Sequence, residues 1–384
     1  MGTMAFIKSL HLANFRSYES TALDGLPSGP VVLYGANGAG KTNVLEALSL
    51  LSPGRGLRGA RLGEMQRRDE PESWTISAAA QTQYGPVRIG TGWDQSRDKK
   101  IIRINGEPAK SQTQLSEWLS CVWLTPQMDR LFLDSASSRR RFLDRLVFAF
   151  DPGHSGRVTR YENATSQRSK ILRESAAPDS VWLEALEISM AETGVALAAA
   201  RLDFVHRLQE ACHRADMSEN TLFPKARLRV SGAIEELLTR VPALEVEELF
   251  RYQLCESRAA DALTGGAATG PHRSDFCVHY IAKDMPASQC STGEQKALLI
   301  GIMIGHARLI AAERGAPPLL LLDEVAAHLD DRRRAGLYDI LLALGGQVWM
   351  TGTDAQLFDH LKGHALFHKI ENGQIQNLAR VCVA

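Results

Sequence analysis

The alternation of apolar and polar residues predicts strands and a helix in the first part of the chain. Apolar residues recur through Phe6–Phe15, which predicts an edge-type strand, and the unbroken run Val31–Gly35 predicts a buried strand that ends in a Gly-rich turn. A helix is expected to follow and to stop at Pro53–Gly54. Four apolar residues mark its buried face: Val44, Leu45, Leu48 and Leu51.

Residues 74–108 are rich in β-forming side chains, whereas residues 131–214 have a helical period. The β-rich segment closes on Asn105–Gly106, a dipeptide typical of tight hairpin turns. Pro152–Gly153 and Pro178 interrupt the helical segment. An apolar stripe at helical spacing follows, formed by Trp182, Leu186 and Met190.

Strand and helix patterns alternate again near the C-terminus. Gly265–Gly270 predicts a flexible joint, and a long apolar helix is expected after Ser291. The runs Leu319–Leu322 and Val348–Met350 predict two further strands. Because α/β segments flank a helical middle, the simplest account is one α/β domain built from both ends of the chain, with a helical insertion between them.

The composition is that of an ordinary globular protein and gives no global attraction to a polyanion. The 384 residues include 44 Lys plus Arg and 44 Asp plus Glu, so binding to nucleic acid would depend on local clusters. There is no basic-then-apolar leader, and the most apolar stretch, Ala297–Ala312, is shorter than the ~20 residues of a membrane span. We expect a cytoplasmic protein with no membrane contact.

The cysteines are scattered and form neither a CxxC pair nor a Cys/His pair at zinc spacing. This distribution favours free thiols in a reducing compartment over a disulfide framework or a metal site. The six residues are Cys121, Cys212, Cys255, Cys277, Cys290 and Cys382.

The residues after the first buried strand fit the phosphate-loop pattern G-x-x-x-x-G-K-[ST] at every fixed position. The glycines let backbone N–H groups approach the β-phosphate, and the next helix adds the positive end of its dipole. Lys41 would reach the β- and γ-phosphates, and Thr42 would offer a hydroxyl to Mg²⁺. A Gly-rich turn with a chance lysine is the alternative, but the required strand and helix flank the motif. The predicted ATP-binding residues are Gly35, Ala36, Asn37, Gly38, Ala39, Gly40, Lys41 and Thr42.

Two carboxylates, Asp323 and Glu324, follow the four-leucine strand. In a P-loop fold this position faces the phosphates, so Asp323 is expected to hold Mg²⁺ through water, and Glu324 to orient and deprotonate the attacking water. The alternative is a helix N-cap, since acidic residues favour first turns. With a matched phosphate loop in the same chain the catalytic interpretation is favoured, and Glu324 and Lys41 are the predicted catalytic residues.

Ser291, Gly293 and Gln295 precede the long apolar helix and resemble the signature motif Leu-Ser-Gly-Gly-Gln of the ABC-type ATPases, with Cys290 in place of the leucine. In that superfamily the motif binds the γ-phosphate of an ATP held on a partner molecule's phosphate loop. A hydroxyl, a bare glycine amide and a helix N-terminus together make an anion receptor. A Ser N-cap with Glu294 as its capping-box partner is compatible with this interpretation.

Other parts of such an ATPase follow in order. By this resemblance Gln127 is a metal- and water-sensing glutamine, and Asp330 lies in the loop that contacts the partner molecule. Transporters usually have a histidine within the segment that corresponds to Met350–Asp354. Thr351 or Thr353 would serve in its place here, and Thr353 is taken as the candidate for ATP contact.

Five segments together resemble the RecF family, bacterial recombination-repair proteins of the SMC-like ABC ATPases. The resemblance covers residues 7–354, with departures at Ser274, where RecF proteins usually carry Asp, and at Ser169, where they carry Asn. The loop at Ser274 is therefore expected to make a different salt bridge. The segments are LHLANFRSY (10–18), YGANGAGKTNVLEALSLLSPGRGLR (34–58), SSRRRFLDRL (137–146), GPHRSDF (270–276) and STGEQKAL (291–298).

The resemblance implies a P-loop ABC-type ATPase head formed from both ends of the chain, with a β-hairpin-rich lobe and an inserted helical domain. Residues 1–128 and 271–384 would form the head, and residues 129–270 the insertion. It further implies a slow, DNA-stimulated ATPase, with ATP and Mg²⁺ as cofactors, that dimerises head to tail around two ATP molecules. Such a protein acts at gaps and single-/double-strand junctions and, with RecR and RecO, helps to load RecA during DNA repair.

The resemblance also assigns individual residues. It adds Arg16 to the ATP-binding set, and it makes Thr42, Gln127 and Asp323 the expected contacts of Mg²⁺. Support for DNA binding from the residues themselves is local, because basic clusters can contact backbone phosphates. The DNA-binding candidates are Arg67, Arg68, Arg139, Arg140 and Arg141.

Two other functions share the phosphate-loop chemistry. A transporter ATPase subunit usually has the switch histidine, and its helical subdomain is usually shorter than the about 160 residues between Gln127 and Ser291. Another SMC-like ATPase, of the chromosome-organising kind, needs a very long heptad run, which the insertion lacks. Stimulation of ATP hydrolysis by duplex DNA would discriminate against the transporter.

Overall fold

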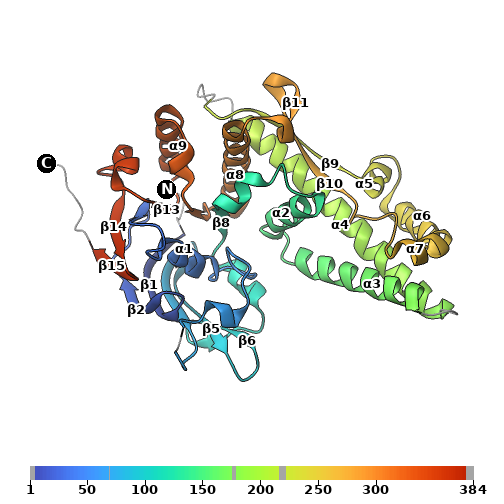
Figure 1. Ribbon diagram of the computed structural model, residues 1–384, viewed down its shortest axis with the longest axis horizontal. Helices are drawn as coiled ribbons and strands as arrows, with labels where there is room; N and C mark the ends of the chain where they lie inside the picture. The colour runs from blue at the N-terminus through green and yellow to red at the C-terminus, as the bar shows by residue number, and fades with distance from the viewer. Residues whose placement is uncertain (1–4, 69, 175–178, 216–221, 378–384) are drawn as a thin grey trace. The chain divides into compact units, whose positions relative to one another are not determined.

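The computed structural model describes four stretches of the chain (Figure 1), residues 5–68, 70–174, 179–215 and 222–377. Their packing forms two units. Unit 1 takes its described residues from the ranges 1–129, 218–223 and 303–384, and unit 2 from the ranges 130–217 and 224–302.

Along the chain, the structure passes from unit 1 to unit 2 near residue 130 and back to unit 1 near residue 302. Unit 2 begins at residue 130, one residue after the predicted start of the helical insertion. Residues 271–302, predicted as part of the ATPase head, belong to unit 2, because β10 (Asp275–Tyr280) pairs along its length with β9 (Ala226–Ser231). The predicted domain bounds, 1–128, 129–270 and 271–384, stay predictions.

The sheet of unit 1 that carries the phosphate loop has six strands in the order β15-β14-β3-β13-β12-β8. Neighbouring strands run parallel, except that β15 is antiparallel to β14. The order inserts β3, from the beginning of the chain, between two strands from its end. The strands are β3 (Val31–Tyr34), β8 (Cys121–Leu124), β12 (Leu319–Leu322), β13 (Val348–Gly352), β14 (Leu366–Glu371) and β15 (Gln374–Asn377).

The second sheet of unit 1 is antiparallel, in the order β2-β1-β4-β5-β6-β7. The prediction that Phe6–Phe15 forms an edge strand is wrong, because β1 lies between β2 and β4. The sequence does not reveal β2 as a neighbour, because only the two ends of β2 are buried and its residues show no apolar alternation. The hairpin predicted at Asn105–Gly106 is confirmed, since it joins β6 to β7. The strands are β1 (Phe6–Phe15), β2 (Tyr18–Leu23), β4 (Thr75–Thr82), β5 (Gly85–Asp94), β6 (Lys99–Ile104) and β7 (Glu107–Pro108).

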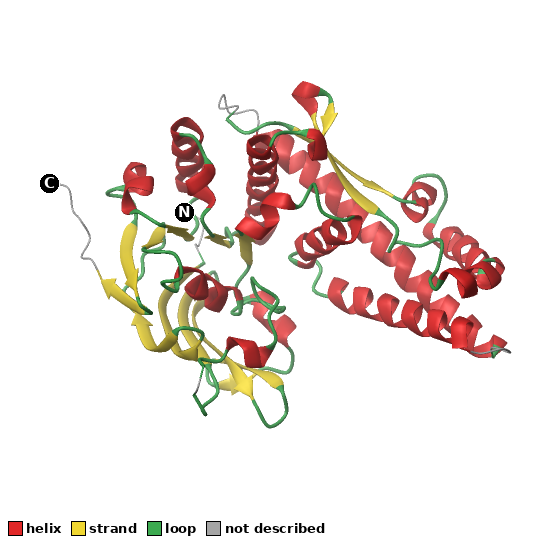
Figure 2. Ribbon diagram, in the orientation of Figure 1, coloured by secondary structure: helices red, strands yellow, loops and turns green. Residues whose placement is uncertain are grey.

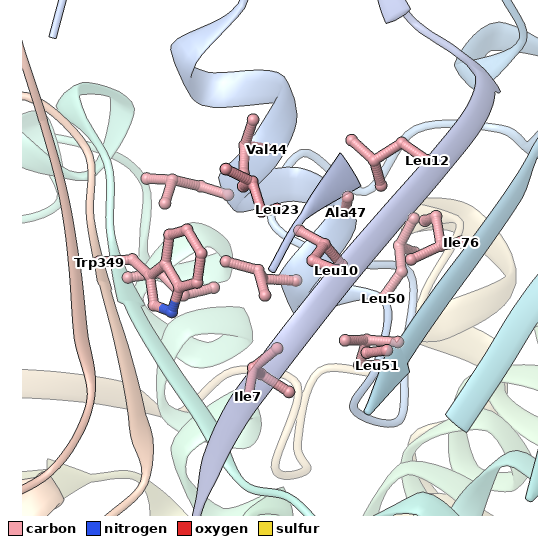
Figure 3. Close-up of a cluster of buried hydrophobic side chains, with 14 of the residues drawn as sticks. Ile7, Leu10, Leu12, Leu23, Val44, Ala47, Leu50, Leu51, Ile76 and Trp349 are labelled. Atoms are coloured by element: carbon pink, nitrogen blue, oxygen red, sulfur yellow. The ribbon is translucent and has the colours of Figure 1, made fainter. Parts of the chain in front are cut away.

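Helix α1 (Lys41–Ser49) lies in the hydrophobic core between the two sheets of unit 1 (Figure 3). Leu10 of β1 contributes to this core from the antiparallel sheet, and Trp349 of β13 contributes from the mixed sheet. Both side chains are almost completely buried. The helix that follows the phosphate loop is therefore held from two sides by apolar packing, which fixes its N-terminus in space.

Helix α1 ends earlier than predicted. Its last residue is Ser49, and Leu50 caps it, although the sequence places the stop at Pro53–Gly54. The carbonyl oxygen of Leu50 accepts a hydrogen bond from Nζ of Lys100 in β6 at 2.9 Å, so a side chain of the antiparallel sheet satisfies the end of the helix.

Unit 2 is mainly helical (Figure 2), as the period of residues 131–214 predicts. Pro152–Gly153 separates α2 from α3, whereas Pro178 lies outside the described residues. The helices are α2 (Ala136–Phe148), α3 (His154–Glu174), α4 (Ser180–Ala215), α5 (Ala233–Leu238), α6 (Ala243–Glu256) and α7 (Arg258–Thr264); β9, β10 and β11 (Met285–Pro286) form a small sheet.

Two predictions for unit 2 are corrected by burial. In the predicted apolar stripe Leu186 and Met190 are buried, but Trp182 is 53% exposed in the first turn of α4. A helical period assigns a residue to a face but does not say where along the helix the core begins. The segment Gly265–Gly270 is a packed turn inside unit 2 and not a joint between domains, since Ala267 within it is buried.

Among the described residues, one helix, α8 (Thr292–Arg314), is long and apolar enough to cross a membrane by length and composition. Inside the protein 78% of its apolar window is buried, as in a core helix. It begins in unit 2 and ends in unit 1. The remaining helices are α9 (Asp331–Leu344) and the 3-10 turns η1 (Leu62–Met65), η2 (Gln112–Glu117), η3 (Pro126–Arg130), η4 (Ile281–Lys283), η5 (Ala287–Gln289), η6 (Val325–His328) and η7 (Ala355–Leu361).

None of the described cysteines forms a disulfide: Cys121, Cys212, Cys255, Cys277 and Cys290. The sixth, Cys382, lies outside the described residues.

Candidate nucleotide site

The phosphate loop connects the end of β3 to the start of α1, the strand and helix that its pattern requires. Gly35, Gly38 and Gly40 have φ angles of 151°, 81° and 113°, where other residues are strained. A Cβ on Gly35 would lie 2.2 Å from the carbonyl oxygen of Ile370, and one on Gly40 would lie 2.9 Å from the hydroxyl of Tyr18. Backbone conformation favours glycine at all three positions, and close packing requires it at positions 35 and 40.

The side chain of Lys41 is buried and folded back onto its own loop. Its Nζ donates to the carbonyl oxygen of Gly35 at 2.7 Å and to that of Ala36 at 2.9 Å. Burial lowers the pKa of Lys41, and the charges of Glu324 and Asp323 oppose this shift. Neutral carbonyl groups are weaker partners for an ammonium than phosphate oxygens, so Lys41 can exchange them for a nucleotide.

The hydroxyl of Thr42 and the carboxylate of Asp323 are in direct contact, although 281 residues separate them. Thr42 Oγ1 donates to Oδ1 of Asp323 at 2.9 Å and lies 3.1 Å from Oδ2. The contact arises because β3, before the loop, and β12, before the carboxylate, flank β13 in one parallel sheet. The fold thus brings together two of the three side chains predicted to hold Mg²⁺.

Thr351 in β13 forms hydrogen bonds with both Asp323 and Glu324. Its hydroxyl donates to Oδ1 of Asp323 at 2.7 Å and accepts from the backbone N–H of Glu324 at 2.9 Å. Glu324 has a φ of 53°, in the left-handed region that few residues other than glycine adopt, so this bond supports the turn that carries its side chain. Thr353, the candidate chosen from the sequence, is exposed; the structure places Thr351, and not Thr353, at the carboxylates.

Gln127 and Asp330 lie in loops of unit 1. Gln127 is exposed in η3, just after β8, whose last residue Leu124 accepts a hydrogen bond from the Asp323 N–H at 2.9 Å. Gln127 therefore follows the strand next to the carboxylate. Asp330 caps α9, where its side chain accepts from the N–H of Arg333 at 2.8 Å. Their roles toward ATP and metal stay predictions.

Arg16 lies between β1 and β2 and is held by Glu46 of α1. Its Nε and Nη2 donate to the two carboxylate oxygens of Glu46 at 2.9 and 2.7 Å, and its Nη1 donates to the carbonyl oxygen of Glu64 at 2.5 Å. Arg58 donates to the same buried carboxylate at 2.8 Å. Two arginines share one carboxylate, which leaves an excess positive charge beside α1, and the contact of Arg16 with ATP stays a prediction.

The donor set at Thr42 and Asp323 fits Mg²⁺, which prefers oxygen ligands and completes its shell with water and substrate phosphates. Among the residues that the structure describes, no group of three or more His, Cys, Asp or Glu side chains is placed to hold a metal. A magnesium ion at this position would therefore depend on the phosphates of a bound nucleotide.

The predicted signature residues lie at the start of α8, in unit 2. The hydroxyl of Ser291 donates to Oε2 of Glu294 at 2.9 Å, and the Ser291 N–H donates to the same oxygen at 3.0 Å. Lys283 forms an ion pair with the other carboxylate oxygen. The hydrogen bond from Lys283 and those from Ser291 lower the pKa of Glu294 to about 2. Ser291 and Gly293 are both exposed, as an intermolecular contact requires.

Gln295, matched from the sequence to the glutamine of the signature, is buried and donates to the carbonyl oxygen of Cys290 at 2.8 Å. With Ser291 as the second position of the five-residue pattern, the fifth position is Glu294 and not Gln295. The match made from the sequence is therefore one residue out of register. The capping-box spacing from Ser291, which predicts Glu294 as a cap, is the signal in the sequence that marks this residue.

Arg139, one of the five predicted DNA contacts, is committed to the fold of unit 2. Its Nε and Nη2 donate to the two carboxylate oxygens of Asp275, each at 2.7 Å, and its Nη1 donates to the carbonyl oxygen of Asp134 at 2.5 Å. These hydrogen bonds occupy most of its donors inside unit 2, and a DNA contact by Arg139 stays a prediction.

The other four candidates are held less firmly. In unit 1, Arg67 pairs with Glu70 at 2.7 Å, and Arg68 is exposed. In unit 2, Arg140 donates to a backbone carbonyl oxygen, and Arg141 is exposed. These four stay predictions as DNA contacts.

Ser274, where the RecF pattern has aspartate, is completely buried. Its hydroxyl donates to Oε1 of Glu235 at 2.6 Å. The Ser274 side chain itself therefore makes no salt bridge. It donates a neutral hydrogen bond to the buried carboxylate of Glu235 instead. Ser169, the other departure, is buried in α3.

Comparison with known proteins decides the family. The family model of the RecF/RecN/SMC N-terminal domain matches residues 6–375. The chain is 47% identical over 377 residues to the DNA replication and repair protein RecF of Mesorhizobium japonicum, and the match covers 98% of each chain. The chain belongs to the RecF family. RecF of a Caulobacter species is 46% identical over 380 residues, with 94% of this chain and 95% of that protein covered.

Solved structures agree with the fold. A structure of the recombination mediator protein RecF-ATPrS in the RecFOR pathway matches with a TM-score of 0.86 at 24% identity, covering 98% of this chain and 99% of that one. The Smc head domain from Pyrococcus furiosus matches with a TM-score of 0.54 at 16% identity over 98% of this chain and 97% of that one. The predicted resemblance to RecF and the fold class of an SMC-like ATPase head are thereby confirmed.

Proposed function

We propose that this RecF-family chain is a cytoplasmic, DNA-binding ATPase of recombinational repair. The contact between Thr42 and Asp323 carries the proposal, because it joins the phosphate loop to the predicted metal carboxylate across 281 residues. A hydroxyl, a carboxylate and a buried ammonium at one end of a parallel sheet suit the binding of a nucleoside triphosphate. Relatives named as DNA replication and repair proteins support the cellular role.

In the proposed reaction Lys41 leaves its two carbonyl partners and binds the β- and γ-phosphates. Glu324, set by the left-handed turn that Thr351 supports, orients a water molecule and takes its proton as the water attacks the γ-phosphate. Mg²⁺, held by Thr42 and Asp323, would neutralise the charge that develops on the phosphate oxygens. The backbone N–H groups of the loop keep the remaining phosphates in place.

The signature half of the site is proposed to act on a second copy of the chain. Ser291 and Gly293 are exposed at the start of α8, and Ser291 would bind the γ-phosphate of an ATP held on the partner's loop. ATP would thus drive dimerisation. We further propose that hydrolysis is slow and stimulated by DNA, and that the dimer acts at gapped or single-/double-strand junction DNA. RecR and RecO would be its partners in RecA loading.

The experiment compares Glu324→Gln with the double variant that adds Ser291→Arg. Sedimentation velocity is measured with and without ATP and Mg²⁺, and with and without duplex DNA. Glu324→Gln is expected to bind ATP, to hydrolyse it at least about a hundredfold more slowly, and to accumulate as a dimer. Adding Ser291→Arg is expected to leave ATP binding intact and to abolish the dimer. A Glu324→Gln chain that stays monomeric with saturating ATP would contradict the shared site.

A further inference from the structure

Unit 2 contains a recess of about 100 Å³ among α2, α3, α4 and the segment before β10. One water needs roughly 10–15 Å³ of such space, so the recess has room for a larger group. Three arginines line it, Arg140 and Arg141 of α2 and Arg201 of α4. The residues of the nucleotide site take no part in it.

The carboxylates of the recess do not balance these arginines. Asp144 already has partners on both carboxylate oxygens. Arg201 donates to each oxygen at 2.8 Å, and Nε2 of His154 lies 2.8 Å from Oδ1. The other lining carboxylate, Glu162, is exposed on α3. Three guanidinium groups and two carboxylates leave an excess of one positive charge.

Within the described part of the chain, Arg140 has no carboxylate partner. Its hydrogen bond runs from Nη1 to the carbonyl oxygen of Ser274 at 2.6 Å. Burial lowers the pKa of Arg140, and the positive charge of Arg201 lowers it further. The charges of Asp144 and Asp275 oppose this shift, but these carboxylates are paired with Arg201 and Arg139. A half-buried guanidinium beside a like charge is unfavourable until an anion neutralises it. Arg140 is therefore the side chain of the recess that most needs an anionic ligand.

Tyr161 and His272 form a rigid, uncharged wall of the recess. The Tyr161 hydroxyl lies 2.6 Å from Nδ1 of His272, and Nε2 of His272 lies 3.0 Å from the carbonyl oxygen of Ala267. Burial lowers the pKa of His272, which favours the neutral ring. In that form the Nε2–H group donates a hydrogen bond to the carbonyl oxygen of Ala267, and Nδ1 accepts a hydrogen bond from the Tyr161 hydroxyl. A Cβ on Gly270 would lie 2.3 Å from the Tyr161 oxygen, so only glycine allows this close packing.

We propose that the recess binds a phosphate monoester, the terminal phosphate of a DNA strand, with Arg140 as its principal ligand. A guanidinium presents paired N–H groups that match phosphate oxygens. Val158, Leu197 and Pro271 form an apolar wall that suits the carbon atoms of the terminal sugar. A terminal phosphate can enter a recess, whereas a phosphate inside a duplex is flanked by nucleotides on both sides. The DNA source rests on the proposed function, but binding of phosphate does not.

The test uses the full chain and a duplex of one sequence whose ends carry hydroxyl groups, 5′-phosphates or 3′-phosphates. Affinity is measured by fluorescence anisotropy at fixed salt. One phosphorylated form is expected to bind about tenfold to a hundredfold more tightly than the hydroxyl form, the size of a charged hydrogen bond. Arg140→Gln should abolish this difference. Arg251→Gln, which removes an exposed charge on α6 outside the recess, should preserve it.

A second measurement separates the sources of phosphate. Inorganic phosphate at an ionic strength matched with chloride should raise the melting temperature of the wild-type chain and not that of Arg140→Gln. Stabilisation by phosphate without any preference for phosphorylated ends would assign the recess to a free phosphate compound. Loss of all duplex binding with stabilisation retained would count against the proposed DNA function and not against the recess. If the wild-type chain shows neither effect, the proposal is overturned, whether or not Arg140→Gln folds.

Discussion

The hydroxyl of Thr351 joins the two carboxylate-bearing residues of the candidate site through one donated and one accepted hydrogen bond. Asp323 would lose a donor if this hydroxyl were removed, and the N–H of Glu324 would lose its acceptor. Because the turn at Glu324 is left-handed, it depends on such support more than an ordinary turn does. Thr351 is thus a positioning residue for the proposed water-activating carboxylate.

Thr351→Val keeps the shape of the side chain and removes its hydrogen bonds. We expect ATP turnover to fall about tenfold to a hundredfold, since a displaced general base loses its alignment with the water. Nucleotide affinity should change less than about threefold, because the phosphate loop is untouched. Thr351→Ser should restore most of the turnover. Steady-state hydrolysis and equilibrium nucleotide binding test this, and full activity of Thr351→Val would show that the hydroxyl has no positioning role.

The residues of the site differ in how far the sequence predicts them. The phosphate loop is contiguous, and its glycines are required by local backbone conformation, so the pattern reveals it directly. Thr351 depends on strand register, because Met350 lies opposite Leu322 and thereby places Thr351 beside Asp323. Glu294 depends on the cap at the start of α8. Local periodicity does not reveal pairings between distant segments, so the sequence alone does not distinguish Thr351 from Thr353.

At the scale of elements, Lys100 of β6 ties the antiparallel sheet to the end of α1. Burial lowers the pKa of Lys100 from 10.5 to about 8. Below pH 8 the group is charged in both the folded and the unfolded chain, and the folded state bears the cost of burying that charge. As the pH rises from about 8 to about 10.5, the folded chain releases the proton first, so this contribution to the free energy of unfolding increases.

Comparison with Lys100→Met isolates this effect. The free energy of unfolding of the wild type minus that of the variant should rise by up to about 1.4 kcal/mol per pH unit between pH 8 and pH 10. Below pH 8 the difference should be constant. Urea unfolding followed by tryptophan fluorescence at pH 7, 8, 9 and 10 provides the measurement. A difference that does not vary with pH would mean that Lys100 keeps an ordinary pKa.

The elements themselves follow from the sequence where burial is continuous along the segment, and less where burial is incomplete. The runs that became β3, β12 and β13 are continuously apolar, and the structure confirms them as strands of one sheet. The position of β1 inside its sheet was missed because β2 has buried side chains only at its ends. Trp182 was misassigned because α4 extends beyond the core that its apolar face predicts.

For the whole molecule, the absence of net charge means that attraction to DNA must come from a few local contacts. The 44 basic and 44 acidic residues cancel, so no long-range field supplements the contacts. We expect the logarithm of duplex affinity to fall linearly with the logarithm of salt concentration, with a slope of roughly −2 to −5. Arg141→Gln should reduce that slope by about one if Arg141 contacts a phosphate. Salt titration by anisotropy tests this, and a flat response would exclude phosphate contacts.

The strand order of the mixed sheet also sets when the nucleotide site can form during synthesis. β3 is made early, but its neighbours β13 and β14 come from the end of the chain, and Gln347 bonds the backbone of Ile7 across 340 residues. At about 5–20 residues per second, a ribosome needs roughly 20–70 s to add those 340 residues. During that interval the emerging phosphate loop has neither its flanking strands nor Asp323, so the nascent protein acquires its ATP site only after β12, β13 and β14 have been made.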